Sequence, residues 1–223
     1  MSYYPIFIDL KGKKVIVVGG GTVAQRKIET LLEYGAVVIV IARELTPSLN
    51  RYVREQKVKL LDQEFKDSHL NGAFMVMAAT DDHTLNRQIS LSARKKGLLI
   101  NAADQPSDCN FIVPSILRRG DLLIAISTSG KSPALAKKIR EDLGKQYGNE
   151  FEILLILMGR LRTEILSRGL SQDENSRMFH GIVDSHILEA IGRKDWMEVA
   201  SILNKILHIQ LSSDDVIEYL TVT

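Results

Sequence analysis

A run of β-branched residues that ends in a glycine-rich corner constrains the fold of this chain more than any other feature. Residues 15–18 read Val-Ile-Val-Val, residues 19–24 read Gly-Gly-Gly-Thr-Val-Ala, and a helical pattern follows at once. In a strand–turn–helix unit of this kind, Gly19 allows the tight turn, Gly21 lets the backbone approach a pyrophosphate, and Ala24 lets the helix pack closely on the strand. The corner therefore predicts a dinucleotide-binding site, and a purely structural turn is the alternative.

Short apolar runs alternate with helical patterns through the first half of the chain. Strands are expected at residues 14–18, 37–41, 58–61, 73–78, 98–101 and 122–127. Helices are expected at residues 24–34, 45–56, 84–96 and 132–143. Nearly continuous apolar strands are typical of parallel sheets that are covered on both faces, and repeated strand–helix units connect by right-handed crossovers. We therefore predict an α/β fold with a Rossmann-type, doubly wound parallel sheet.

The pattern changes after about residue 144, where strand signals end. Ile153, Leu154, Leu157 and Leu161 follow helical spacing, whereas the polar residues 167–175 are expected to form a loop. These changes divide the chain into three expected regions. They are a Rossmann domain over residues 1–113, a connecting segment over 114–146 and a small all-helical C-terminal domain over 147–223.

Composition argues against several classes of function. The formal net charge of +2 is too small to indicate nucleic-acid binding. No apolar run reaches the roughly 18 residues of a membrane span, and the N-terminal residues lack the basic and apolar regions of a secretory signal. The single cysteine, Cys109, excludes an internal disulfide and fits a reducing compartment. We therefore expect a cytoplasmic protein without nucleic-acid or membrane partners.

The carboxyl ends of the expected strands carry the candidate binding residues, because ligands of open α/β sheets lie there. Arg43 and Glu44 follow the second strand, about 20 residues after the glycines. Glu44 is a candidate for a ribose hydroxyl, and Arg43 is a candidate either for stacking on adenine or for pairing with a 2′-phosphate. NAD is favoured over NADP, and a solvated charge pair is the alternative for these two side chains.

Three aspartates lie near the same edge of the expected sheet. Asp104 directly follows a strand, where a carboxylate could accept a proton as a hydride departs, but a loop aspartate also often caps a turn. Asp81 and Asp82 are expected to supply the cap of the helix that starts near Thr84, with a paired-carboxylate site as the alternative.

A second glycine-containing turn precedes the expected helix at 132–143. Its hydroxyls, amides and lysine suit a carboxylate-rich ligand, and the candidates are Ser127, Thr128, Ser129 and Lys131. Arg118 and Arg119, beside Gly120, form a hairpin-like turn and are candidates for the same ligand or for a solvated surface. No metal site is expected, because zinc-type spacing is missing among His69, His83, His180, His186 and His208.

Five groups of motifs carry a family resemblance over residues 1 to about 150. They are Pro5-Ile6-Phe7 with Leu10, residues 17–27, residues 78–82, residues 101–104 with Phe111, Pro114 and Ser115, and residues 127–136 with Arg140-Glu141. On these motifs the chain resembles precorrin-2 dehydrogenase, the NAD-dependent enzyme of siroheme synthesis. It is similar also to the N-terminal half of multifunctional siroheme synthases.

The resemblance implies NAD-dependent oxidation of precorrin-2, a small-molecule tetrapyrrole, to sirohydrochlorin. Many members of the family also insert ferrous iron, which would then be a second substrate. The family's acid–base aspartate falls on Asp104, and the carboxylates of the tetrapyrrole need donors such as Lys131, Arg118 and Arg119. The family's dinucleotide contacts fall on Thr22, Val23, Arg43 and Glu44, and close to Thr80.

The family's subunits form homodimers in which the segment after the nucleotide domain crosses between partners. The resemblance therefore assigns dimerisation and tetrapyrrole contact to residues 114–146. Two other interpretations stay open at this point. One is a dehydrogenase without ferrochelatase activity, and the other is a non-catalytic module that senses a dinucleotide.

Overall fold

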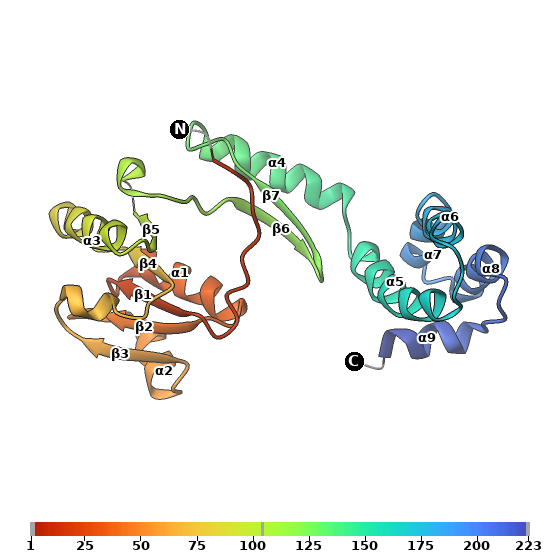
Figure 1. Ribbon diagram of the computed structural model, residues 1–223, viewed down its shortest axis with the longest axis horizontal. Helices are drawn as coiled ribbons and strands as arrows, with labels where there is room; N and C mark the ends of the chain where they lie inside the picture. Colours follow the sequence, from red (N-terminus) through yellow and green to blue (C-terminus); the bar gives the residue numbers. More distant parts are fainter. Residues whose placement is uncertain (1–2, 104, 222–223) are drawn as a thin grey trace. The chain divides into compact units, whose positions relative to one another are not determined.

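The computed structural model describes residues 3–103 and 105–221 of the chain, which separate into two units, Met1–Val113 and Pro114–Thr223 (Figure 1). The first unit holds a parallel sheet of five strands in the order β3-β2-β1-β4-β5. The strands are β1 (Lys14–Val18), β2 (Val37–Ile41), β3 (Val58–Asp62), β4 (Met75–Ala78) and β5 (Leu99–Ala102). From β1 the chain first builds outward to β3 and then crosses back to β4. The strand order therefore reverses beside β1, and a ligand crevice is expected at the carboxyl ends of β1 and β4.

Helices cover both faces of this sheet, as a doubly wound fold requires. Helices α1 (Thr22–Glu33) and α2 (Pro47–Arg54) pack on one face, where Ile28 and Leu49 are fully buried. Helix α3 (His83–Lys95) and the 3₁₀ turn η1 (Asp67–Leu70) pack on the other, and a second 3₁₀ turn, η2 (Pro106–Asp108), follows β5. The prediction of a Rossmann-type sheet is confirmed.

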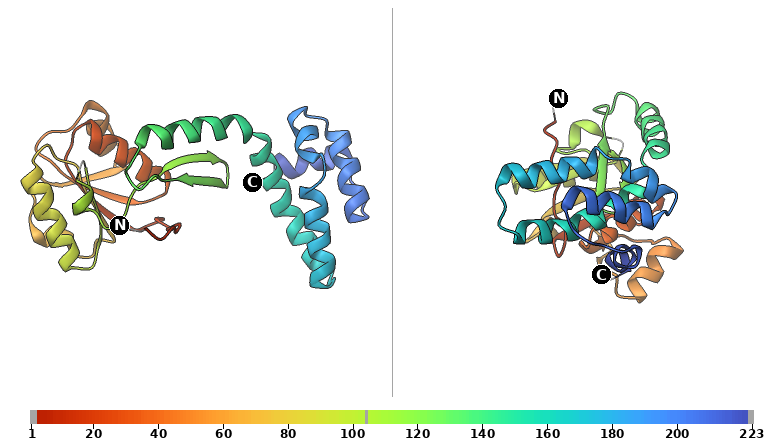
Figure 2. Two further views of the ribbon diagram at one scale, coloured as in Figure 1. Left: turned by 90° about the horizontal axis from the view of Figure 1, so that it is seen from above. Right: turned by 90° about the vertical axis from the view of Figure 1, so that its right-hand side faces the viewer.

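A β-hairpin opens the second unit. Strands β6 (Ser115–Arg119) and β7 (Leu122–Ile126) pair antiparallel in a sheet of their own, beside α4 (Pro133–Gln146) (Figure 2). The expectation that residues 122–127 would extend the large parallel sheet is therefore wrong. Two strands separated by a two-residue turn with Gly120 at φ +55° can only pair antiparallel, since a parallel neighbour needs a long crossover.

The rest of the second unit is helical, as the apolar spacing predicts. Its helices are α5 (Glu150–Ser167), α6 (Gln172–Val183), α7 (Ile187–Gly192), α8 (Trp196–Leu207) and α9 (Ser213–Thr221). They bury a common core that includes Leu157, Leu161 and Leu203. No helix in the described part of the chain is long and apolar enough to cross a membrane. The division of this unit between residues 146 and 147 stays a prediction.

The loop expected over residues 167–175 is half as long as predicted, because α6 already begins at Gln172. Ser171 accepts a hydrogen bond from the backbone N–H of Glu174, while the Glu174 carboxylate accepts from the backbone N–H of Ser171. This capping box starts the helix inside a polar stretch. The Ser-x-x-Glu spacing of Ser171 and Glu174 is the sequence signal from which the start of this helix could have been predicted.

Candidate functional site

The glycine corner lies at the point where the strand order reverses. Gly19 has φ +119°, and a Cβ atom there would lie 2.1 Å from the carbonyl oxygen of Ala79, just after β4. Only glycine therefore lets the β1–α1 turn pack against the end of β4. The Gly19 N–H donates to the carbonyl of Ile41 at 2.9 Å, which joins the same turn to the end of β2.

Gly20 is equally constrained, although the sequence analysis assigned it no role. A Cβ atom on Gly20 would lie 1.9 Å from the carbonyl oxygen of Glu44, and the Gly20 carbonyl accepts from the N–H of Thr46 at 3.0 Å. Gly20 thus brings the loop after β2 against the corner. A glycine at the variable position between Gly19 and Gly21 was the signal that could have identified this contact.

Gly21 differs from both neighbours, because a Cβ atom there would meet no atom of the described residues within 4 Å. It is the N-cap residue of α1 and provides no side-chain cap, and the first turn of α1 contains no acidic residue. The other two helices of this unit are capped, α2 by Thr46 and α3 by Asp82. The N-terminus of α1 thus combines open space with N–H groups that no side chain caps, an arrangement that fits a pyrophosphate.

The two predicted contact residues in the first turn of α1, Thr22 and Val23, differ in burial. Thr22 is exposed at the helix N-terminus, next to the open space at Gly21. Val23 is half-buried, and its side chain packs against the core that α1 shares with the sheet. Ala24 is fully buried, as close packing of the helix on the strand requires.

Arg43 and Glu44 follow β2, and both are exposed. Arg43 Nη2 lies 2.6 Å from Glu64 Oε1 in the loop after β3, an ion pair that the sequence analysis did not include. Glu44 contacts the corner through its backbone, since its carbonyl oxygen lies against Gly20. Each residue at the end of β2 thus contacts another loop at this edge of the sheet, Arg43 through its side chain and Glu44 through its backbone, and their part in ribose binding stays a prediction.

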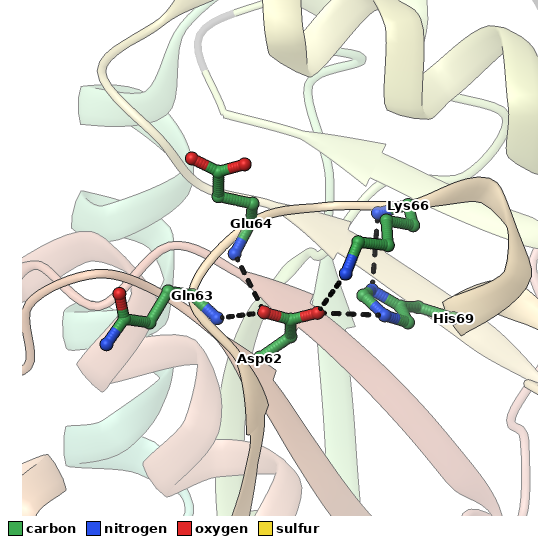
Figure 3. Close-up of polar contacts among 5 residues, drawn as sticks. All are labelled: Asp62, Gln63, Glu64, Lys66 and His69. Atoms are coloured by element: carbon green, nitrogen blue, oxygen red, sulfur yellow. Dashed lines mark hydrogen bonds and ion pairs between the residues drawn. The ribbon is translucent and has the colours of Figure 1, made fainter.

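Asp62, the last residue of β3, organises the loop that carries Glu64 (Figure 3). Its carboxylate accepts hydrogen bonds from Lys66 Nζ at 2.8 Å and from the backbone N–H groups of Gln63 and Glu64 at 2.7 and 3.4 Å. These donors stabilise the charged form and lower the pKa of Asp62 from 3.8 to about 2. His69 Nε2 lies 3.5 Å from the same carboxylate.

Thr80, at the end of β4, holds its own loop in place. Its hydroxyl donates to Oδ1 of the buried Asn86 at 2.8 Å, and Asn86 Nδ2 donates back to the Thr80 carbonyl at 2.8 Å. Asp82 Oδ1 accepts from the N–H groups of Thr84 and Leu85 at 2.8 and 3.0 Å. The prediction that an aspartate of this pair caps the helix is confirmed for Asp82.

Asp104, the predicted proton acceptor, lies outside the described residues. The strand before it is anchored by Asn101, whose Oδ1 accepts from Lys27 Nζ on α1 at 2.8 Å. The loop after it is held by Cys109, whose Sγ accepts from the N–H of Ala102 at 3.1 Å. Cys109 is buried, as expected for an ordinary core thiol.

The candidates for substrate contact occupy the two ends of the hairpin. Arg118 and Arg119 lie next to the turn, whereas the polar loop at 127–131 follows the other end of β7. At about 3.4 Å per residue, the ends of a five-residue strand are about 14 Å apart. The structure thus does not bring the arginines and the polar loop together at one end of the hairpin.

Hydrogen bonds hold residues of both the polar loop at 127–131 and the hairpin turn. In the polar loop, Ser127 Oγ accepts from the N–H of Ser129 at 3.0 Å, and Thr128 Oγ1 accepts from the N–H of Ser132 at 3.1 Å. Lys131 is exposed. At the turn, Arg119 Nη2 donates to the Gly144 carbonyl on α4 at 3.2 Å, and its buried Nε has no hydrogen-bond partner among the described residues.

Two protein-family models match the chain in order. Residues 6–115 match a family described as NAD(P)-binding, and residues 119–146 match a family described as the central part of sirohaem biosynthesis proteins. The first covers the sheet and its glycine corner, and the second covers most of the hairpin together with the polar loop and α4.

Curated relatives include siroheme synthases. The chain is 40% identical over 168 residues to the siroheme synthase of Photorhabdus laumondii, which covers 75% of this chain and 36% of the relative. It is 31% identical over 214 residues to that of Mannheimia succiniciproducens, which covers 96% of this chain and 44% of the relative. The chain thus spans about two fifths of the length of these relatives.

A solved structure is similar over most of the chain. It is that of SirC, a precorrin-2 dehydrogenase, which superposes with a TM-score of 0.77 at 28% sequence identity. The match covers 93% of this chain and 100% of the SirC chain.

Proposed function

Because the chain belongs to the siroheme-biosynthesis family that contains precorrin-2 dehydrogenase and siroheme synthase, we propose that it oxidises precorrin-2 to sirohydrochlorin with NAD. The observation that carries the proposal is the glycine corner. Gly19 and Gly20 are required by the packing of the protein itself, whereas Gly21 leaves open space before the uncapped N-terminus of α1. A purely structural turn does not explain why that third position is glycine and the helix is left uncapped.

The residues that would hold NAD surround this corner. The first-turn amides of α1 and the Thr22 hydroxyl would bind the pyrophosphate, with Val23 contributing its backbone N–H. Glu44 and Arg43 lie at the end of β2, where this fold binds the ribose of the adenosine. Thr80 would line the crevice between β1 and β4 through its backbone. NAD, when bound, supplies the hydride acceptor.

Asp104 is the residue that we propose as proton acceptor. Its place in the sequence, two residues after β5, supports this role, since β5 ends at the same edge of the sheet as β1 and β4. Oxidation of the macrocycle removes a hydride and a proton together, so a carboxylate next to the reacting carbon would accept the proton. Asn101 and Cys109, on either side of this position in the sequence, are each held by a hydrogen bond to another described residue.

The tetrapyrrole substrate carries several carboxylates, and we assign their binding to Arg118, Arg119, Lys131 and the hydroxyls of Ser127, Thr128 and Ser129. Because the arginines and the polar loop lie at opposite ends of the hairpin, they would contact different carboxylates of the tetrapyrrole rather than the same one. We further propose that residues 114–146 form the contact of a homodimer. Leu135 on α4, which is 49% exposed, supports this assignment. The single cysteine thiol supports a cytoplasmic location.

Incubation of the protein with precorrin-2 and NAD without oxygen tests the proposal directly. We expect the absorption spectrum of sirohydrochlorin to appear together with NADH in equal amounts. Binding of NAD without turnover would contradict the proposal and favour a dinucleotide-sensing module instead. Ferrous iron added afterwards tests the second reaction, in which the iron is a substrate. Siroheme formation no faster than in the absence of protein would identify a dehydrogenase without ferrochelatase activity.

A further inference from the structure

The ion pair between Arg43 and Glu64 connects two loops at the carboxyl edge of the sheet. Arg43 follows β2, Glu64 follows β3, and Arg43 Nη2 lies 2.6 Å from Glu64 Oε1. Their side chains are 74% and 66% exposed, respectively. A pair this exposed adds little to folding stability, because water and salt screen it. Folding stability therefore gives little reason for this ion pair, and its position beside the expected ribose site suggests a role in binding.

The turn at Asp62 holds the backbone of Glu64. The Asp62 carboxylate accepts the backbone N–H of Glu64, and in Figure 3 the Glu64 carboxylate points away from Asp62. Lys66 and His69 hold Asp62 from the other side. Because the Lys66 backbone N–H donates to His69 Nδ1 at 3.2 Å, the ring nitrogen that faces Asp62 is the one that carries a proton. The turn thus presents Glu64 through its backbone and leaves the carboxylate free to meet Arg43.

The charges around this turn sum to a negative value. The loop after β2 carries Arg43 and Glu44, and residues 62–66 carry Asp62, Glu64 and Lys66, so these three acidic and two basic residues have a formal charge of −1. Lys66 is engaged by Asp62 and Arg43 by Glu64. A phosphate on the ribose 2′-oxygen that bound Arg43 would therefore compete with the Glu64 carboxylate for the guanidinium.

We propose that Glu64 is a specificity-determining residue that makes the chain prefer NAD to NADP by engaging Arg43. This inference rests on the dinucleotide site proposed above. An arginine at the end of the second strand is the group that receives a 2′-phosphate in this fold, because its planar guanidinium matches phosphate oxygens. Glu64 already holds that guanidinium and adds a charge that repels phosphate. A ribose with a free 2′-hydroxyl does not need the Arg43 guanidinium and is not repelled by the Glu64 carboxylate.

Replacement E64Q tests the inference, because glutamine keeps the size of the side chain and the backbone N–H that bonds Asp62. The dissociation constants of NAD and NADP are measured by calorimetry on the full chain. We expect the ratio of Kd for NADP to Kd for NAD to fall about tenfold, which is about 1.4 kcal/mol, and the change to shrink at high salt. R43Q should act in the opposite direction and raise that ratio, since it leaves Glu64 without its cation.

Glu55 offers a matched control at the other end of β3. It is also exposed and ion-paired, with its Oε2 2.8 Å from Lys57 Nζ, but it precedes the strand. E55Q should leave the ratio unchanged. The inference is overturned if E64Q keeps the wild-type ratio while NAD still binds, or if E55Q changes the ratio as much. A wild-type chain that binds neither dinucleotide contradicts the proposed function instead.

Discussion

Replacing Gly21 by aspartate should stabilise the protein and at the same time weaken NAD binding. Gly21 is the N-cap of α1, with φ −81° and ψ −171°, a backbone conformation that any residue can adopt. A Cβ atom there meets no described atom within 4 Å, so the new side chain fits. An aspartate at this position can accept an N–H of the first turn and interact with the positive end of the helix dipole.

The expected stabilisation is small but measurable. Replacing glycine by aspartate at an N-cap contributes a few tenths of a kcal/mol, and the favourable charge at the helix end brings the sum to about 0.5–1 kcal/mol. For a unit of about 100 residues, this raises the melting temperature by about 2–5 °C. Thermal unfolding without ligand, followed by circular dichroism, measures this shift.

The expected loss of binding is larger, because the new carboxylate occupies the place assigned to the pyrophosphate. Two unit charges about 4 Å apart repel by about 1 kcal/mol in water and about 4 kcal/mol near a protein surface. The Kd for NAD should therefore rise by a factor between about 5 and about 1,000. Gly21→Asn is the matched control, since asparagine caps as well as aspartate and has the same size without the charge. Gly21→Asp with wild-type affinity for NAD would refute the placement of the pyrophosphate at α1.

Three further replacements test the packing and the pH dependence of the fold. Gly19→Ala should destabilise the first unit by about 2–3 kcal/mol in urea unfolding, because its Cβ would lie 2.1 Å from the Ala79 carbonyl at a positive φ; an unchanged midpoint would contradict this. Ser132→Ala should cost the second unit about 1 kcal/mol, since Ser132 Oγ caps α4 at 3.2 Å from the Leu135 nitrogen. The folded pKa of Asp62, about 2, lies below the usual 3.8, so Asp62 stabilises the fold above about pH 4 and loses this effect as the pH falls towards 2. Asp62→Asn should therefore flatten the fall of unfolding free energy over that range, and a profile as steep as that of the wild type would count against the assignment.

The sheet was predictable because its determinants are local. The strands predicted at residues 14–18 and 37–41 coincide with β1 and β2, since strands covered on both faces are nearly continuous apolar runs. The cap by Asp82 was predictable for a similar reason, as an aspartate two residues before Thr84 can reach the first N–H groups of a helix. In both cases the deciding contacts lie within a few residues of each other in the chain.

The predictions that were wrong or missing concern residues whose interaction partners cannot be identified from the local sequence pattern. An apolar run such as that of β7 reads the same in a parallel sheet and in a hairpin, so only the pairing with β6 decides between them. The ion pair of Arg43 joins residues 21 positions apart, and it depends on β2 and β3 being neighbours in the sheet. The contacts of Gly20 with Glu44 and of Glu64 with Arg43 are of this non-local kind, and the local pattern does not identify them.

The most direct test of the account compares NADH formation from precorrin-2 by the wild type and by Asp104→Asn under anaerobic conditions, at saturating NAD. If this aspartate accepts the proton, the rate should fall by at least about 100-fold, which is the smaller end of general-base catalysis, while the Kd for NAD stays within about twofold. Turnover of the variant at the wild-type rate would contradict the account.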